Sequence, residues 1–222
     1  MENGHFADIL KHILVKNQKF FNIFSKMTPI ELIQHNISGY IRLEAEEMAF
    51  FTSLLETRQI KKRQLLLHEG EICKYSAFIT DGCLRGYIFD KNGFERVLSF
   101  APVNWWIADM YSLISQKPGV LNIEALEDTG VLLLSKTDQE KLYTQIPKFE
   151  RFFRIITENS LVANQQRLLD NLSLSAEERY NNFCKKYPSL INQLPLKQIA
   201  SYIGVTPQFF SKMRNEMLRK KS

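Results

Sequence analysis

The sequence has little of several residue types that mark particular classes of protein. Its 222 residues include only 9 glycines and 7 prolines, too few for a collagen-like or low-complexity chain. No apolar run approaches the roughly 18 residues that a membrane-spanning helix needs. The 3 cysteines, Cys73, Cys83 and Cys184, form no Cys-x-x-Cys pair, which argues against a disulfide framework or a cysteine-ligated zinc or iron–sulfur site. We therefore expect a globular protein of the reducing cytoplasm, with no bound metal and no membrane partner.

The sequence also lacks the motifs of common enzyme classes. It has no Gly-x-Gly-x-x-Gly, Walker, Gly-x-Ser-x-Gly or His-Glu-x-x-His pattern. Adjacent acidic residues, such as Glu127 and Asp128, are explained by helix starts or turns. No histidine lies near a cysteine at metal-ligand spacing; the 4 histidines are His5, His12, His35 and His68. We expect no enzymatic activity, no catalytic residue and no cofactor.

Basic residues are concentrated at one end of the chain. Residues 172–222 hold 9 Lys and Arg against 3 Asp and Glu, whereas residues 1–171 hold 20 against 21. A small basic terminal domain on a neutral body suggests a polyanionic partner, because each cation set against a phosphate releases condensed counterions. A solvated tail at Arg219, Lys220 and Lys221 would raise the count in the same way. Composition alone leaves both interpretations open.

The first 34 residues are predicted to form a helical extension. Lysines at positions 11, 16 and 19 interrupt this segment, so it does not have the unbroken apolar core of a signal peptide. Packing on its own protein or on a second copy is favoured over binding to a membrane surface. A second helix is expected to start at Glu44, Glu46 and Glu47. The apolar residues of the first helix recur at about 3.6-residue spacing, at Phe6, Ile9, Leu10, Ile13, Leu14, Phe21 and Phe24.

Residues 35–146 are predicted to form an antiparallel β-barrel of the jelly-roll, cupin-like kind, which makes the fold class α+β. Short runs rich in branched and aromatic residues alternate there with turn residues, a spacing typical of sandwiches and barrels. The turn at 90–93, Asp-Lys-Asn-Gly, supplies the positive φ angles that tight hairpins need. The predicted strand runs are 64–68, 75–80, 84–89, 94–100, 121–126 and 131–135.

Residues 147–171 are predicted to form one long dimerisation helix. Its apolar and amide residues follow alternating three- and four-residue steps, typical of a helix that meets another helix. Such a seam is a contact with a second copy or the edge of a face buried against the barrel, and we favour the dimer. Ser175 and Glu178 then form a capping box for the next helix, which places a domain boundary near Leu172. The seam residues are Phe152, Ile155, Asn159, Val162, Gln166 and Leu169.

Residues 172–222 contain the most specific signal, a helix-turn-helix over 196–213. Such a motif needs a small residue where its helices touch and a glycine at the turn, and Ala200 and Gly204 meet these demands. Thr206 and Pro207 form a good N-cap and N1 pair for the second helix. The core-facing residues are Ile199, Ile203, Val205, Phe210 and Met213.

If the second helix enters the major groove of double-stranded DNA, its outward residues reach base edges. Glutamine can bond adenine, and lysine can donate to guanine. The alternative is a small helical bundle with a basic surface and no nucleic acid. The predicted base-reading residues are Pro207, Gln208, Ser211 and Lys212. The predicted phosphate-contacting residues are Lys197, Thr206 and Arg214.

Together these features resemble the Crp/Fnr family of bacterial transcription regulators over roughly residues 35–222. The resemblance implies a sensor barrel, a long dimer helix and a C-terminal winged helix-turn-helix. It also implies a homodimer on a near-palindromic operator, with RNA polymerase as a candidate partner, and it supports the same base-reading positions. The residues that carry it are Glu69, Gly70, Glu71, Phe78, Ile79, Gly82, Gly93 and Glu95, with the stretch 197–212.

The sequence departs from this family where its members bind ligands. Cyclic-nucleotide-binding members carry a Gly-Glu pair and a later Arg that neutralises the phosphate. This chain has Asn-Trp-Trp-Ile-Ala-Asp at 104–109, and it has no Arg between Arg96 and Arg151. The cysteine cluster of oxygen-sensing members is absent before Cys73. Trp105 and Trp106 are expected to be packing residues.

We therefore predict no ordinary cyclic AMP binding, and the effector and its site stay unknown. The alternative function is a small-molecule or cyclic-nucleotide binding protein whose C-terminal domain does not bind DNA.

Overall fold

The computed structural model describes residues 27–219. These residues form two compact units, one of residues 27–88 and 98–163 and the other of residues 89–97 and 164–219. The predicted helix within residues 5–26 lies outside the described part of the chain. None of the described helices is both long and apolar enough to span a membrane.

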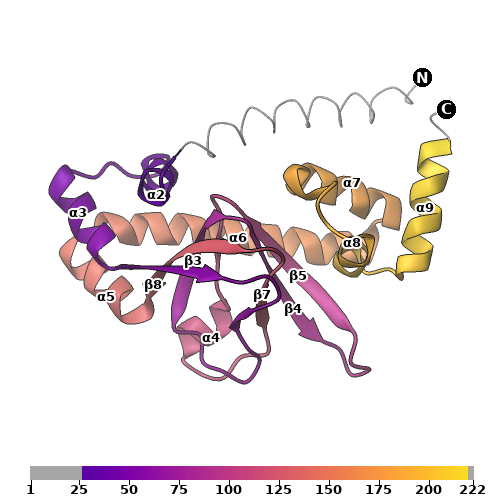
Figure 1. The fold of residues 1–222 in the computed structure, drawn as a ribbon, viewed down its shortest axis with the longest axis horizontal. Coiled ribbons are helices and arrows are strands. Elements are labelled where there is room, and N and C mark those ends of the chain that lie inside the picture. Colours follow the sequence, from indigo (N-terminus) through magenta and orange to yellow (C-terminus); the bar gives the residue numbers. More distant parts are fainter. Residues whose placement is uncertain (1–26, 220–222) are drawn as a thin grey trace. The chain divides into compact units, whose positions relative to one another are not determined.

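The first unit combines short helices with two antiparallel sheets (Figure 1). The tips of β4 and β5 belong to the second unit, and α6 begins in the first unit and ends in the second. The helices are α2 (Pro29–Ser38), α3 (Ala45–Ser53), α4 (Met110–Ser115), α5 (Lys136–Gln145) and α6 (Lys148–Ser173). The strands are β1 (Leu55–Ile60), β2 (Leu65–Leu67), β3 (Tyr75–Asp81), β4 (Cys83–Phe89), β5 (Glu95–Pro102), β6 (Trp106–Ile107), β7 (Asn122–Ala125) and β8 (Thr129–Ser135).

The strands form two four-stranded sheets, in the orders β1-β8-β3-β6 and β2-β7-β4-β5. In the first sheet β8 lies between β1 and β3, and Ala77 pairs with Leu133. This mixed α+β arrangement with a jelly-roll-like β domain is the fold class that the sequence predicts. Each predicted strand run overlaps an observed strand. Strands β1 and β6 and helices α4 and α5 were not predicted from the sequence.

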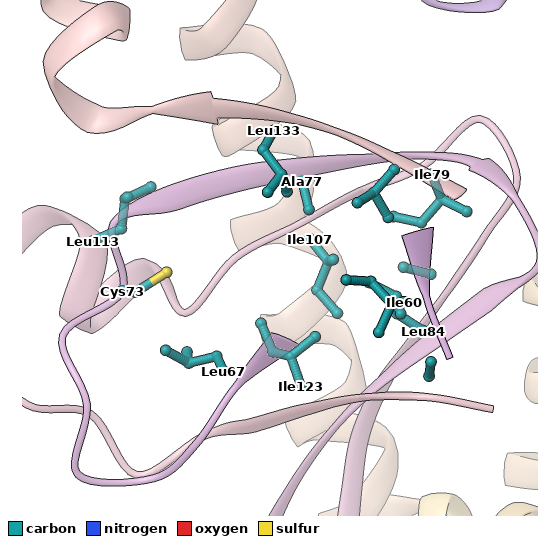
Figure 2. Close-up of a cluster of buried hydrophobic side chains, with 13 residues drawn as sticks. Ile60, Leu67, Cys73, Ala77, Ile79, Leu84, Ile107, Leu113, Ile123 and Leu133 are labelled. Carbon is teal, nitrogen blue, oxygen red and sulfur yellow. The ribbon is translucent and has the colours of Figure 1, made fainter. Parts of the chain in front are cut away.

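Aliphatic side chains fill the interior between the sheets (Figure 2). On β3, β7 and β8 the core residues are two apart, at Ala77 and Ile79, Ile123 and Ala125, and Val131 and Leu133, as the two-residue period of a strand requires. All three cysteines are buried, and burial raises the pKa of the Cys73 and Cys83 thiols. Both are therefore packing residues with little thiolate character at neutral pH. The core cluster includes Ile60, Leu67, Ala77, Ile79, Leu84, Ile107, Ile123, Val131 and Leu133.

Aromatic side chains pack the start of α6 against the rest of the first unit. Phe152 is fully buried, and its ring lies 5.5 Å from that of Tyr40 and 6.1 Å from that of Trp106. The Trp106 indole also donates to Asn36 Oδ1 at 3.2 Å, so the prediction that Trp106 is a packing residue is confirmed. Phe152 was predicted for a seam with a second copy, but its partners lie within its own chain. The three- and four-residue spacing is the same for both kinds of contact.

The second unit is helical apart from the β4–β5 tip. Its helices are the end of α6, α7 (Ala176–Lys186), the short 3₁₀ helix η1 (Pro188–Leu190), α8 (Leu196–Ile203) and α9 (Pro207–Arg219). A winged helix-turn-helix also needs a β-hairpin, but residues 172–219 contain no strand. The prediction of a wing is therefore wrong within residues 172–219. After Met213 the described chain continues as helix instead of taking up the two-residue alternation of a strand.

The turn glycines allow a matched test of the barrel. Gly82 and Gly93 have φ angles of 75° and 77°, so alanine at either position should cost about 1–2 kcal/mol of folding free energy. A Cβ at Gly82 would also lie 2.6 Å from the Asp128 carbonyl oxygen, whereas a Cβ at Gly93 meets nothing within 4 Å. Gly82→Ala should therefore cost about 1–3 kcal/mol more than Gly93→Ala in urea unfolding. Equal losses would contradict the close approach at Gly82.

Candidate nucleic-acid interface

An aromatic core holds the last three α-helices together. The Tyr180 ring of α7 packs edge-on against Phe210 of α9, with ring centroids 5.0 Å apart. Phe183 of α7 lies 5.5 Å from Tyr202 of α8, and Tyr202 also packs edge-on against Tyr187. Each ring buries a large apolar area, so these contacts fix α8 and α9 against α7.

The turn between α8 and α9 forms where the sequence predicts it. Gly204 adopts a left-handed backbone with φ 75° and ψ 33°, and it ends α8. The next amide, that of Val205, donates to the Ala200 carbonyl at 3.0 Å and satisfies one of the free carbonyls of the helix end. Ala200 is fully buried, as expected for the small residue where the helices touch. The helix-turn-helix geometry of this segment is thus confirmed.

Arg179 reinforces the same turn, and the sequence analysis missed it. Its Nε donates to the Ile203 carbonyl at the end of α8 at 2.9 Å, and its Nη1 donates to the Leu174 carbonyl at 2.7 Å. The guanidinium thus ties the end of α8 to the chain that follows α6. Arg179 lies near the N-terminus of α7, where the helix dipole disfavours a cation. This unfavourable position was the sequence signal that Arg179 has a structural role.

Helix α9 separates a buried side from an exposed side. The Phe209 amide donates to Thr206 Oγ1 at 3.2 Å, so Thr206 is the predicted N-cap. The residues that face the core are Phe210, Met213 and Met217. Of the predicted base-reading residues, Pro207, Gln208 and Lys212 are exposed and Ser211 is half-buried. All four lie in the first two turns of α9, on or beside its outer face.

The three predicted phosphate-contacting residues differ in their surroundings. Lys197, in the first turn of α8, and Thr206 are exposed. Arg214 is half-buried beside Tyr180, whose pKa burial raises to about 12 while Arg214 acts in the opposite direction. The guanidinium of Arg214 is therefore partly engaged by its own protein.

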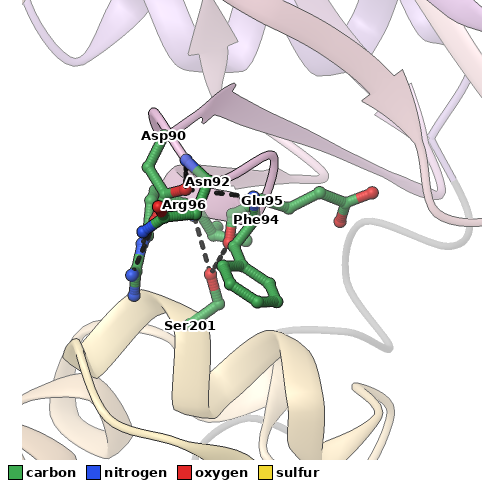
Figure 3. Close-up of polar contacts among 7 residues, drawn as sticks. Asp90, Asn92, Phe94, Glu95, Arg96 and Ser201 are labelled. Atoms are coloured by element: carbon green, nitrogen blue, oxygen red, sulfur yellow. Dashed lines mark hydrogen bonds and ion pairs between the residues drawn. The ribbon is translucent and has the colours of Figure 1, made fainter.

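A hairpin tip, residues 89–97, is bonded to α8 within the second unit (Figure 3). Asp90 organises the tip, since its carboxylate accepts from the Asn92 and Phe94 amides and from Arg96 Nε. The Ser201 hydroxyl points toward the tip, where it donates to the Glu95 carbonyl at 2.7 Å and accepts from the Val97 amide at 3.0 Å.

Arg167 of α6 adds a second bond to the same strand. Its Nη2 donates to the Val97 carbonyl at 2.8 Å and to the Tyr202 carbonyl at 3.1 Å. Val97 thus bonds to the helices through both its amide and its carbonyl. The hairpin tip and α8 form one bonded assembly, which the sequence analysis did not predict.

The segment between β6 and β7 tests whether a cyclic phosphate fits the barrel. The buried Asp109 carboxylate accepts from the Ser112 amide at 3.1 Å and caps α4. A Cβ at Gly119 would lie 2.1 Å from Asp109 Oδ2, so this carboxylate fills the space beside Gly119. The one cationic residue of this segment, Lys117, is exposed. A phosphate buried beside Asp109 would face a carboxylate, and the one cation of this segment is exposed.

The barrel also contains one deeply buried cation, which already has an acidic partner. Arg85 on β4 donates through Nε and Nη2 to Glu124 Oε2 on β7, at 3.2 and 2.5 Å. Its side chain is 4% exposed, and its guanidinium lies 4.1 Å from the centre of the Tyr87 ring. The Glu124 carboxylate thus neutralises this cation.

One protein-family model matches part of the chain. The model of the cyclic nucleotide-binding domain matches residues 57–145, which contain most of the barrel. No curated protein sequence matches the chain.

Solved structures share the fold across most of the chain. FixK2 from Bradyrhizobium japonicum is similar with a TM-score of 0.66 and 20% identity, over 75% of this chain and 85% of that one. A putative Crp/Fnr-family regulator from Eubacterium rectale has a TM-score of 0.63 and 15% identity, over 80% and 85%. The c-di-GMP-responsive regulator CLP from Xanthomonas campestris has a TM-score of 0.63 and 11% identity, over 80% and 93%. The chain thus has the fold of Crp/Fnr regulators.

The bonded assembly of hairpin tip and α8 can be tested at Ser201. Ser201→Ala removes the hydroxyl that donates to the Glu95 carbonyl and accepts from the Val97 amide. We expect a loss of about 1–3 kcal/mol of local stability, measured as faster hydrogen exchange at the Val97 amide. Ser173→Ala is the control, because that hydroxyl donates only to a carbonyl of its own helix at Leu169. Unchanged exchange at Val97 would contradict the bond.

Proposed function

We propose that the protein is a sequence-specific DNA-binding transcription regulator of the Crp/Fnr type, which acts as a homodimer in the bacterial cytoplasm. The observation that carries the proposal is the α8–Gly204–α9 motif, whose second helix leaves Gln208 and Lys212 exposed. In a helix-turn-helix these positions face base edges in the major groove. The similar solved structures that are named as regulators support the same function.

The proposed roles of the interface residues follow from their chemistry. Pro207, Gln208, Ser211 and Lys212 read bases, with Gln208 suited to adenine and Lys212 to guanine. Lys197 and Thr206 contact phosphates and set the register. Arg214 contacts phosphate only with the part of its guanidinium that faces away from Tyr180. The excess of basic residues in 172–222 supports a polyanionic partner.

The proposed dimer contact is the second half of α6. We call its exposed leucine and valine side chains the α6 stripe, and each of them is 50–77% exposed. Steps of seven and four residues place them on one side of the helix, as in a seam between two helices. A second copy of the chain would cover this apolar surface and bring two α9 helices to one operator. The stripe consists of Leu161, Val162, Leu168, Leu169 and Leu172.

The proposed regulator does not use a cyclic nucleotide through the usual phosphate contacts. The Asp109 carboxylate beside Gly119 and the paired Arg85 support this part of the proposal. The family-model match alone favours the other function, a cyclic-nucleotide binding protein without DNA binding. Direct titrations separate the two functions.

DNA binding is tested by fluorescence anisotropy with fragments selected from genomic DNA. The logarithm of the affinity should fall by several units per tenfold increase in salt. Gln208→Ala should relax base preference at one position of each half-site and cost about 1–3 kcal/mol there, because it removes a base contact. Lys197→Ala should weaken all sequences alike and lower the salt slope by about one unit per subunit.

Salt-independent or undetectable binding by the wild-type chain would overturn the proposal. Equal effects of Gln208→Ala and Lys197→Ala on matched and mismatched sites would mean that the base-reading residues are misplaced. Thermal melts of both variants provide the folding control, since both side chains are exposed.

The dimer is tested by a charge in the α6 stripe. Val162→Glu or Leu169→Glu should shift the mass in light scattering from twice the 26.0 kDa of one chain toward one chain, because a carboxylate would be buried in an apolar seam. These variants should also bind operator poorly, because half-sites about 34 Å apart need both recognition helices. Ser160→Glu, on an exposed position of α6 outside the stripe, is the control. An unchanged mass for the stripe variants would place the dimer contact elsewhere.

Cyclic AMP should not bind, because its phosphate would lie against Asp109 without a cation. We expect no heat of binding in calorimetry at cyclic AMP concentrations up to about 1 mM. At this concentration a ligand is detected if its binding free energy is about −4 kcal/mol or more favourable. Asp109→Asn is the matched variant, because it removes the repelling charge and keeps an acceptor for the Ser112 amide. Binding of cyclic AMP by the wild-type chain would contradict this part of the proposal.

A further inference from the structure

Phe209 is a large apolar side chain exposed on the helix that carries the proposed DNA-reading residues. Its side chain is 52% exposed, whereas the neighbouring Phe210 is fully buried. Two of its exposed neighbours on this part of α9, Gln208 and Lys212, are polar. The aromatic core explains Phe210 through its contact with Tyr180, but no core contact explains why position 209 is aromatic.

The position of Phe209 is fixed by the start of α9. Its amide donates to Thr206 Oγ1 at 3.2 Å, which anchors its backbone in the first turn. Residues three apart on a helix are neighbours on its surface, so Phe209 lies beside Lys212. It also directly follows Gln208 in the chain. A helix that presents Gln208 and Lys212 to a DNA groove therefore brings Phe209 to the wall of the same groove.

The chemistry of Phe209 restricts what it can contact there. A phenyl ring offers no hydrogen bond to a phosphate or to a polar base edge. The apolar group that the major groove presents is the C5-methyl group of thymine, and phenylalanine is among the side chains that contact it. Burial of that methyl group against an exposed ring removes apolar surface of both partners from water.

We infer that Phe209 is a specificity-determining residue that contacts a thymine methyl group in each half-site of the operator. This inference rests on the proposed function and adds an apolar contact to the polar base-reading set. Phe209 is distinct from that set, because it selects thymine by the methyl group alone.

The test replaces the methyl group and the ring separately. Operator fragments are obtained by selection with the wild-type chain, and each thymine is then replaced in turn by deoxyuridine, which pairs identically but lacks the methyl group. For the wild-type chain, one replacement per half-site should weaken binding about three- to tenfold, the effect expected for one or two buried carbon groups. Phe209→Ala should bind the thymine fragment more weakly and should bind the thymine and deoxyuridine fragments equally.

Two controls make the outcome specific. Gln208→Ala should still distinguish thymine from deoxyuridine at that position, although its binding is weaker. Circular dichroism melts of Phe209→Ala should match the wild type, because the ring is exposed and outside the core.

The failures of the inference and of the proposed function are distinguishable. If the wild-type chain binds DNA but no thymine replacement weakens binding, or if Phe209→Ala keeps the full deoxyuridine penalty, the inference is overturned and the proposed function stands. If the wild-type chain binds no DNA, both are overturned.

Discussion

The left-handed backbone at Gly204 is the constraint on which the proposed interface depends. It ends α8 and lets α9 start after two residues, so that Phe210 enters the aromatic core beside Tyr180. The bonds of Arg179 to the end of α8 hold this geometry. If the turn opened, α9 would rotate and Phe210 would lose its burial. The exposure of Gln208 and Lys212 is thus a consequence of where Phe210 is buried.

The barrel achieves stability by filling its interior with aliphatic side chains and pairing its buried charges. Asp109 accepts a bond from the Ser112 amide and caps α4, and Arg85 pairs with Glu124, so each of these buried side chains has a hydrogen-bond partner. In our proposal the same residues leave no group to hold a cyclic phosphate, so that a domain with this fold need not bind that ligand.

The β4–β5 tip, residues 89–97, bonds to the helix-turn-helix within the second unit. The bonds of Ser201 and Arg167 are made to the backbone at Glu95 and Val97. The partners in these bonds are backbone groups of the tip. A change in the backbone conformation of the tip would therefore alter the bonds, and the side chains at positions 95 and 97 would not matter.

Several elements were predictable because local rules specify them. The capping box of Ser175 and Glu178 starts α7, and the turn at Gly93 joins β4 to β5. Other elements carried weak local signals. Strand β1, Leu-Glu-Thr-Arg-Gln-Ile, is largely polar, so it lacks the clear apolar alternation of a strand. Helix α5 has few apolar residues and was missed for the same reason.

The sequence by itself determined the helix-turn-helix, because a glycine, a small residue and an N-cap act on their immediate neighbours. Only the tertiary structure decided which partner covers an apolar residue. Phe152 and Val162 share one helical spacing, yet Phe152 packs against Tyr40 and Trp106 while Val162 is exposed. The bonds of Ser201 and the fit of Asp109 beside Gly119 also join residues brought together by folding. Periodicity shows that a face must be buried, but the partner that buries it depends on contacts far apart in the chain.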